Sequence, residues 1–231
     1  MIGNQQLKFD WNVYAEGRLL SRNRLLFPEH RLTILQFINY FKDLDINLTI
    51  LDVGCGDGFW LEILRDLGFN NLFGVDISHS FLKRAKGKGF NVAQYDISNM
   101  FFLRKFDVVI MCDVLEHLSD LNSSLICVRD VLKNDGIFYL MVPVYDSLSS
   151  KINRLVHKKR KIDEAKEHDE THLHAFSKLS LISLLESYHF IVIKSIYTAN
   201  RLPFITGKIQ QITFGNRFGN WLSVISKKGR S

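Results

Sequence analysis

Apolar and polar stretches alternate along this chain in a way that predicts alternating strands and helices. Short apolar runs, typical of buried strands, are separated by stretches with the apolar periodicity of helices. The predicted strands are residues 49–53, 71–75, 90–95, 106–111, 136–142, 190–197 and 221–227; the predicted helices are residues 59–67, 78–86, 121–132 and 177–188. This alternation predicts an α/β fold with a doubly wound parallel sheet.

Three further stretches exceed what such a sheet needs. Residues 9–44 have a broad apolar helical face with a break at Pro28, so residues 1–47 are predicted to form a helical cap. Residues 144–176 and 201–220 are long connections, and long connections of this kind are usually functional. We expect one domain, residues 1–231, in which these two connections form a substrate lid.

The turn after the first predicted strand reads Gly54-Cys55-Gly56-Asp57-Gly58. Glycines at such a turn allow sharp bends and let a ligand approach the backbone. A dinucleotide is therefore one candidate ligand, because glycine-rich turns before helices bind phosphates. Two features argue against it: Phe59 stands where the dinucleotide pattern has its last glycine, and Asp52 would repel a pyrophosphate. The carboxylate of Asp52 instead favours a cationic cofactor.

Acidic residues follow several of the predicted strands. Asp52, Asp76 and Asp96 lie at or just past strand ends, and Cys112-Asp113 follows the fourth strand in the same way. In a parallel sheet the ligand lies outside the carboxyl ends of the strands. These residues are therefore predicted to contribute to one shared site.

The glycine turn and the acidic residues resemble the motifs of class I S-adenosylmethionine (SAM) methyltransferases. The group most similar is the small-molecule type, which includes the ubiquinone/menaquinone and sugar O-methyltransferases. The resemblance rests on motifs over residues 48–142 and on the order of elements elsewhere. It implies SAM as the cofactor and a Rossmann-like sheet in the order 3-2-1-4-5-7-6. Strand 7 of that sheet would be antiparallel, with added N-terminal helices and a lid insertion after strand 5.

The resemblance also assigns roles to individual residues. Asp76 matches the carboxylate that binds both ribose hydroxyls, a task suited to a group that only accepts hydrogen bonds. Asp96 matches the acceptor for the adenine amine, and Ile97 the residue packed on that ring. Gly54 and Gly56 match the approach to the methionine part. The cofactor-binding residues implied in this way are Asp52, Gly54, Gly56, Asp76, Ile77, Asp96, Ile97, Cys112 and Val114.

Histidines are the candidate catalytic residues. Methyl transfer mainly requires positioning of the acceptor, but a hydroxyl acceptor benefits from a general base with a pKa near neutrality. His117 follows the fourth strand, near the cofactor in the family pattern. His172 and His174 are two residues apart and point to the same side if that segment is extended. Which of the three acts as the base stays open, with Tyr145 or water as further alternatives.

A metal site is not expected. His168, His172 and His174 could bind a metal together with Asp169 or Glu170, but their spacing matches no standard zinc motif. Asp113 alone does not make the magnesium site of catechol-type methyltransferases.

Composition limits the location and the partners. The net charge is +6, and the three cysteines show no metal spacing. We expect a cytoplasmic protein, because no apolar run is long enough to span a bilayer and residues 1–10 lack a signal-peptide pattern. The basic run Lys158–Lys161 is typical of a solvated helix face. Together with an aromatic loop containing Phe204, Phe214 and Phe218, it would allow peripheral membrane contact and a lipid-linked acceptor.

Three functions remain open at this stage. The favoured one is O-methylation of a small molecule such as a sugar, polyketide, phenol or quinone-like compound. A nucleic-acid methyltransferase is disfavoured, because the segment Cys112-Asp113-Val114-Leu115 lacks the Asn/Asp-Pro-Pro-aromatic signature of base amino methylation. A catalytically silent SAM-binding protein is the third. The acceptor and the oligomeric state cannot be read from the sequence.

Overall fold

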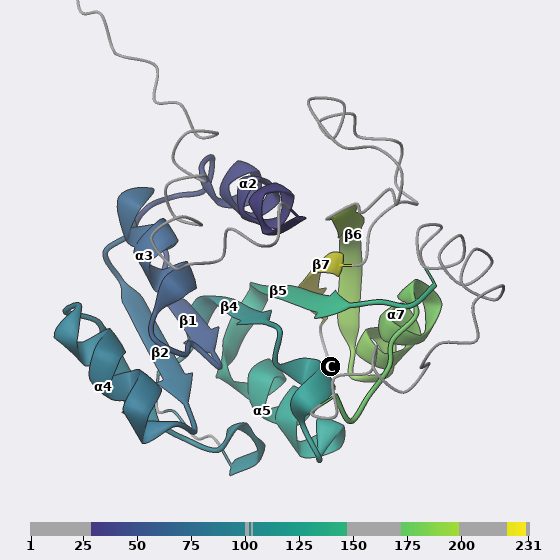
Figure 1. The fold of residues 1–231 in the computed structure, drawn as a ribbon. Coiled ribbons are helices and arrows are strands. Elements are labelled where there is room, and N and C mark those ends of the chain that lie inside the picture. Colours follow the sequence, from purple (N-terminus) through teal and green to yellow (C-terminus); the bar gives the residue numbers. More distant parts are fainter. Residues whose placement is uncertain (1–28, 100–101, 103, 147–171, 199–220, 230–231) are drawn as a thin grey trace, which may run out of the picture.

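A seven-stranded sheet runs through the centre of the protein (Figure 1). The computed structural model describes residues 29–99, 102, 104–146, 172–198 and 221–229. The strand order is β3-β2-β1-β4-β5-β7-β6. Strands β1 to β5 pair in parallel, and β7 is antiparallel to both of its neighbours. The strand order and the antiparallel β7 expected from the sequence are therefore confirmed.

The strands are β1 (Ile50–Val53), β2 (Leu72–Asp76), β3 (Asn91–Gln94), β4 (Phe106–Cys112), β5 (Leu132–Pro143), β6 (Phe190–Thr198) and β7 (Trp221–Lys228). Most ends differ from the prediction by only one or two residues. β5 is the exception, because it begins at Leu132 instead of residue 136. Leu132 pairs with Phe106, and the register with β4 then shifts before Val108 pairs with Ile137. Leu132, predicted as the last residue of a helix, and residues 133–135 are thus part of an irregular strand.

The helices are α2 (Glu29–Phe41), α3 (Phe59–Asp66), α4 (His79–Gly87), α5 (Leu121–Val131) and α7 (Lys178–Ser187), with single 3₁₀ turns η1 (Ile97–Asn99) and η2 (Leu115–His117). Side chains cap three helix N-termini. Ser78, Asp120 and Ser177 each accept a hydrogen bond from the backbone amide three residues later. Such caps satisfy amides that have no partner within the helix, and they fix where α4, α5 and α7 begin.

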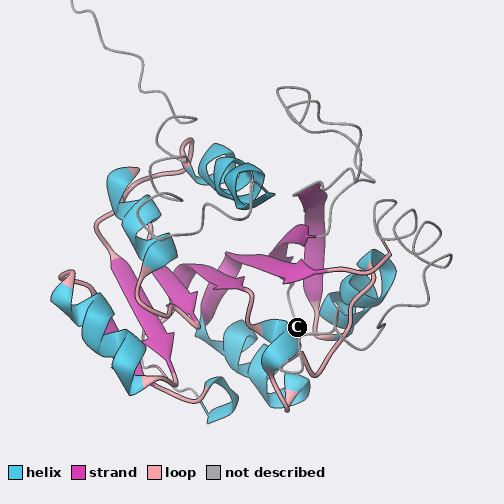
Figure 2. Cartoon of the chain, in the orientation of Figure 1, coloured by secondary structure: helices cyan, strands magenta, loops and turns pink. Residues whose placement is uncertain are grey.

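Helices cover both faces of the sheet (Figure 2). On one face, α2, α3 and α4 pack over a core that contains Phe37, Phe41 and Tyr139. On the other face, α5 and α7 pack over a core that contains Leu125, Phe138 and Leu181. The aromatic residues of the first core are in mutual contact, with ring centroids of Phe37 and Tyr139 5.2 Å apart. Two packed layers of helix therefore hold the strand ends in place.

Some predicted segments lie outside the described residues. They include residues 1–28 of the helical cap, residues 147–171 with Lys158–Lys161, His168, Asp169 and Glu170, and residues 199–220 with Phe204, Phe214 and Phe218. The division into cap, domain and lid stays a prediction. Among the helices that the structure describes, none has the length and apolar character needed to cross a membrane.

Candidate functional site

The glycine loop after β1 bends in a conformation that suits glycine. Gly54 has a φ of +72° and Gly56 a φ of +53°. The amides of Gly54 and Cys55 both donate to the carbonyl of Val75 on β2, at 2.8 and 2.9 Å. A Cβ on Gly54 would lie 2.2 Å from Val114 Cγ2, so the loop packs tightly against the segment after β4. These contacts explain why a glycine is needed at residue 54.

Gly56 is a glycine for a different reason. No described atom lies within 4 Å of a Cβ built there, so the backbone faces open space. That space is a cavity of about 1090 Å³ over the carboxyl ends of the strands. The cavity is lined by every expected cofactor-binding residue except Asp52, namely Gly54, Gly56, Asp76, Ile77, Asp96, Ile97, Cys112 and Val114. The strand ends therefore bring these residues together around one cavity, and their roles in binding a cofactor stay predictions.

Asp76 joins the glycine loop to the end of β2. Its Oδ2 accepts a hydrogen bond of 2.8 Å from the amide of Gly56, and its Oδ1 accepts one of 2.8 Å from the amide of Ser78. An ionised carboxylate has about four lone-pair sites, so two sites remain for a ligand. The carboxylate thus holds the loop in place and can still accept hydrogen bonds from a ligand in the cavity.

Asp52 is buried within β1 and does not line the cavity. It is 1% exposed, and no described residue donates a hydrogen bond to its Oδ2. Burial and the nearby Asp76 raise the pKa of its carboxyl well above the usual value. A direct contact between Asp52 and a cofactor stays a prediction.

Large apolar side chains are exposed at the edge of the cavity. Ile77 is 68% exposed, Phe81 43% and Tyr95 37%, and all three line the cavity. Neighbouring exposed apolar groups of this size usually mark a place that binds something. Phe81 and Tyr95 were not predicted as site residues. The position of Tyr95 directly before Asp96 could have identified it as a site residue, whereas no sequence motif marks Phe81.

The segment after β4 forms another part of the wall. His117, Leu118 and Ser119 line the cavity, as does Asp113. Asp113 has a φ of +59°, which is unusual for a residue other than glycine, and its amide donates to the carbonyl of Met141 at 3.0 Å. Backbone outliers of this kind tend to cluster at functional sites. No local sequence pattern indicates this conformation.

Residues 172–174 dock on η2. The amides of Leu173 and His174 both donate to the main-chain oxygen of Glu116, at 2.8 and 3.0 Å. Nε2 of His174 lies 2.8 Å from the carbonyl oxygen of Leu118. A carbonyl only accepts, so Nε2 of His174 carries the proton in this contact. This docking fixes His172 beside the cavity wall, although neither His172 nor His174 lines the cavity itself.

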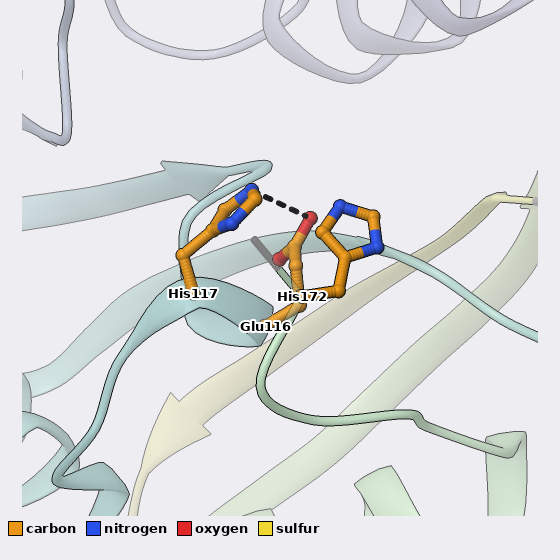
Figure 3. Close-up of side chains that lie close together, drawn as sticks. All are labelled: Glu116, His117 and His172. Atoms are coloured by element: carbon orange, nitrogen blue, oxygen red, sulfur yellow. Dashed lines mark ion pairs between the residues drawn. The ribbon is translucent and has the colours of Figure 1, made fainter. Parts of the chain in front are cut away.

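Glu116, His117 and His172 form one cluster, which we name the Glu–His cluster (Figure 3). The rings of His117 and His172 meet edge to face, with centroids 4.6 Å apart. Oε1 of Glu116 lies 3.9 Å from Nε2 of His117. Glu116 is fully buried, and neither carboxylate oxygen accepts a hydrogen bond from a described residue. Its burial raises the pKa of the carboxyl to about 7.

The comparisons with known proteins agree with this geometry. A family model described as a methyltransferase domain matches residues 17–195. An uncharacterised protein of Methanocaldococcus jannaschii is 35% identical over 139 residues, which cover 60% of this chain and 58% of that protein. A ubiquinone biosynthesis O-methyltransferase of Bartonella quintana is 30% identical over 104 residues, 41% of this chain and 40% of that one. The chain thus spans about half the length of these relatives.

A solved structure shows the same fold. The crystal structure of a SAM-dependent methyltransferase from Archaeoglobus fulgidus superposes with a TM-score of 0.62 at 24% identity. The match covers 95% of this chain and 100% of that one. Because the family model covers more than half of the residues and the sheet has the strand order of that fold, the chain belongs to the methyltransferase-domain family of class I SAM-dependent methyltransferases.

Proposed function

We propose that this protein transfers the methyl group of SAM to a hydroxyl oxygen of a small-molecule acceptor. The observation that carries the proposal is the cavity, which joins a wall suited to a nucleoside to a wall that carries a histidine. The likeness to a ubiquinone biosynthesis O-methyltransferase supports oxygen as the acceptor atom. Family membership supports SAM as the methyl donor.

The cavity residues fit SAM. Gly54 and Gly56 leave the backbone open to the methionine part, and no side chain stands in the way at Gly56. The free acceptor capacity of Asp76 suits the ribose hydroxyls. The exposed Ile77 and Tyr95 provide apolar surface for a flat base. These features together would hold a nucleoside that carries a cationic amino-acid chain.

Asp96 is suited to accept from an adenine amine. Its Oδ1 accepts hydrogen bonds from the amide and the hydroxyl of Ser98, at 3.0 and 2.8 Å. These bonds lower the pKa of its carboxyl, so Asp96 stays ionised at neutral pH. Ile97, which is buried next to it, offers the apolar contact.

Methyl transfer from SAM requires little of the protein beyond positioning the acceptor. When bound, SAM supplies a methyl group on a sulfonium, so the acceptor oxygen bonds to the methyl carbon while the carbon–sulfur bond breaks. The chain must bring the hydroxyl close, exclude water and accept a proton. We propose that the Glu–His cluster handles the proton, because His117 lines the cavity and His172 and Glu116 contact it. His174, held on the carbonyl of Leu118, is then a positioning residue.

The acceptor can be tested directly. Purified protein is incubated with SAM and pools of phenols, quinols, sugars and RNA, and mass spectrometry follows the products. The proposal expects a methyl ether in a hydroxyl-bearing small molecule, and much less of this product with Asp76→Ala at a SAM concentration that does not saturate the variant. Methylation of nitrogen, or of RNA alone, would contradict the proposed acceptor while leaving the family unchanged.

A further inference from the structure

We propose that the Glu–His cluster binds a divalent transition-metal ion at the wall of the cavity. Glu116, His117 and His172 each offer one ligand atom, and the three side chains lie close together (Figure 3). By sequence spacing His172 groups with His168 and His174, and nothing in that spacing combines it with Glu116. The structure brings them together from η2 and from the segment before α7.

The spacing of the ligand atoms is compatible with one ion. All three lie within 4.8 Å of one another, and Nε2 of His117 is 3.9 Å from Oε1 of Glu116. Ligand atoms at about 2.0–2.2 Å from a tetrahedral zinc ion are roughly 3.3 Å apart. The cluster must therefore contract by about 1 Å, which small rotations of the side chains can supply.

The backbone holds the cluster independently of any ion. Two amides from residues 173 and 174 donate to the main-chain oxygen of Glu116, and the ring of His174 contacts the carbonyl of Leu118. This double attachment sets His172 directly against His117. Preorganised ligands of this kind lower the entropy lost when a metal binds.

Glu116 gives an independent indication of a cation. It is fully buried, and neither carboxylate oxygen accepts a hydrogen bond within the described part of the chain. A buried carboxylate without such partners is costly, and buried charges are usually paired or coordinate metals. The carboxylate points at the two imidazole rings, so an ion between them would satisfy it.

The donor set selects the kind of ion. Two imidazoles and one carboxylate are typical ligands of Zn²⁺, Fe²⁺ and similar ions, whereas Mg²⁺ and Ca²⁺ prefer oxygen ligands. Three protein ligands also leave at least one coordination position open, as in catalytic sites. Because His117 lines the cavity, an open position would be accessible from the cavity.

The ion would explain how the cluster activates an acceptor, a step that rests on the proposed function. An ion held there would lower the pKa of a bound hydroxyl, so the cluster would handle the proton by favouring its release to water. The oxygen then forms its bond to the methyl carbon, and the electron pair of the broken carbon–sulfur bond stays on sulfur. No free imidazole base is needed in this scheme.

Metal binding can be measured without SAM or an acceptor. Full-length protein without a histidine tag is freed of metal with a chelator and titrated with Co²⁺, whose visible absorption reports four-coordinate nitrogen and oxygen ligands. Zn²⁺ then competes in calorimetry, and Mg²⁺ serves as the oxygen-preferring comparison. We expect a single Zn²⁺ or Co²⁺ per chain and no saturable Mg²⁺ binding at this site.

Matched variants locate the ion. Glu116→Gln and His172→Ala should each weaken Zn²⁺ at least about tenfold, whereas His79→Ala, on the exposed start of α4, should change nothing. Glu116→Gln removes the buried charge, so the metal-free variant should unfold at no lower urea concentration than the wild type. This measurement separates loss of a ligand from loss of the fold.

Two results would overturn the inference: absence of saturable Zn²⁺ and Co²⁺ binding, or binding that persists unchanged in both cluster variants. Methyl transfer by fully metal-free protein would show that the ion does not activate the acceptor hydroxyl. If transfer occurs without metal binding, the site is wrong and the proposed function stands. If metal binds at the cluster but no hydroxyl is methylated, the site stands and the proposed function fails.

Discussion

The carboxylate of Asp76 accepts a hydrogen bond of 2.8 Å from the backbone amide of Gly56. This bond joins the end of β2 to the loop after β1. In the proposed cofactor site this bond holds Asp76, which is expected to bind the ribose, at a fixed position relative to Gly56, which is expected to face the methionine part. A side-chain change at either position should therefore act on the same ligand.

Gly56→Ala should abolish tight SAM binding with only a modest loss of stability. The φ of +53° disfavours alanine by roughly 1–2 kcal/mol, and the new Cβ would project into the cavity. Gly89→Ala is the matched control, because Gly89 has a φ of +85°, equally open surroundings and no place in the cavity lining. Urea unfolding and calorimetry should show similar stability losses but a loss of SAM affinity for Gly56→Ala alone. Equal SAM affinities in the two variants would contradict the assignment.

Asp52→Asn should stabilise the cofactor-free protein, and more so at higher pH. Burial and Asp76 raise the pKa of Asp52 in the folded state above its unfolded value of about 3.9. The folded state therefore binds the proton more tightly, and Asp52 destabilises the fold progressively as the pH rises from about 4 to the raised pKa. Asparagine does not titrate, so the gain should be near zero at pH 4 and grow toward pH 8.

The gain should approach about 1.4 kcal/mol for each unit by which the pKa is raised. Urea unfolding at several pH values checks this, with the exposed Asp43→Asn as control. A gain that is independent of pH would show that the pKa of Asp52 is not raised in the folded state, and a loss at pH 8 would show that Asp52 is ionised and stabilised there.

His117→Ala should lower turnover strongly while SAM affinity is little changed. The Glu–His cluster is proposed to activate the hydroxyl, and such proton handling contributes typically about 10²–10⁴-fold to rate. His172→Ala should also slow the reaction, because its ring contacts His117, and His174→Ala should have a smaller effect through the lost contact with Leu118. Steady-state kinetics and calorimetry measure both properties. Full activity in all three variants would exclude the cluster from the reaction.

Much of the fold follows from local sequence patterns. Apolar runs ending in acidic residues correctly predicted the parallel strands, and the glycine run predicted a loop whose positive φ values only glycine adopts easily. The early start of β5 was missed, because it depends on the pairing of Leu132 with Phe106 and not on a local pattern.

The Glu–His cluster could not be predicted for a similar reason. Glu116 and His172 are far apart in the sequence, and their contact depends on the docking of residues 173 and 174 on the main-chain oxygen of Glu116. Sequence spacing carries no information about such a hydrogen bond. The burial of Asp52 could not be predicted either, because a carboxylate at a strand end can point to either side of the sheet.

Calorimetric titration of SAM into the wild type and Asp76→Ala tests the central claim most directly. The wild type should bind SAM and its demethylated product saturably and should not bind NAD. Asp76→Ala should lose at least about tenfold in SAM affinity, since each hydrogen bond to a charged group contributes roughly 1.5–3 kcal/mol, while Asp43→Ala should bind as the wild type does. Equal affinities in the wild type and Asp76→Ala, or saturable binding of NAD without SAM, would contradict the account.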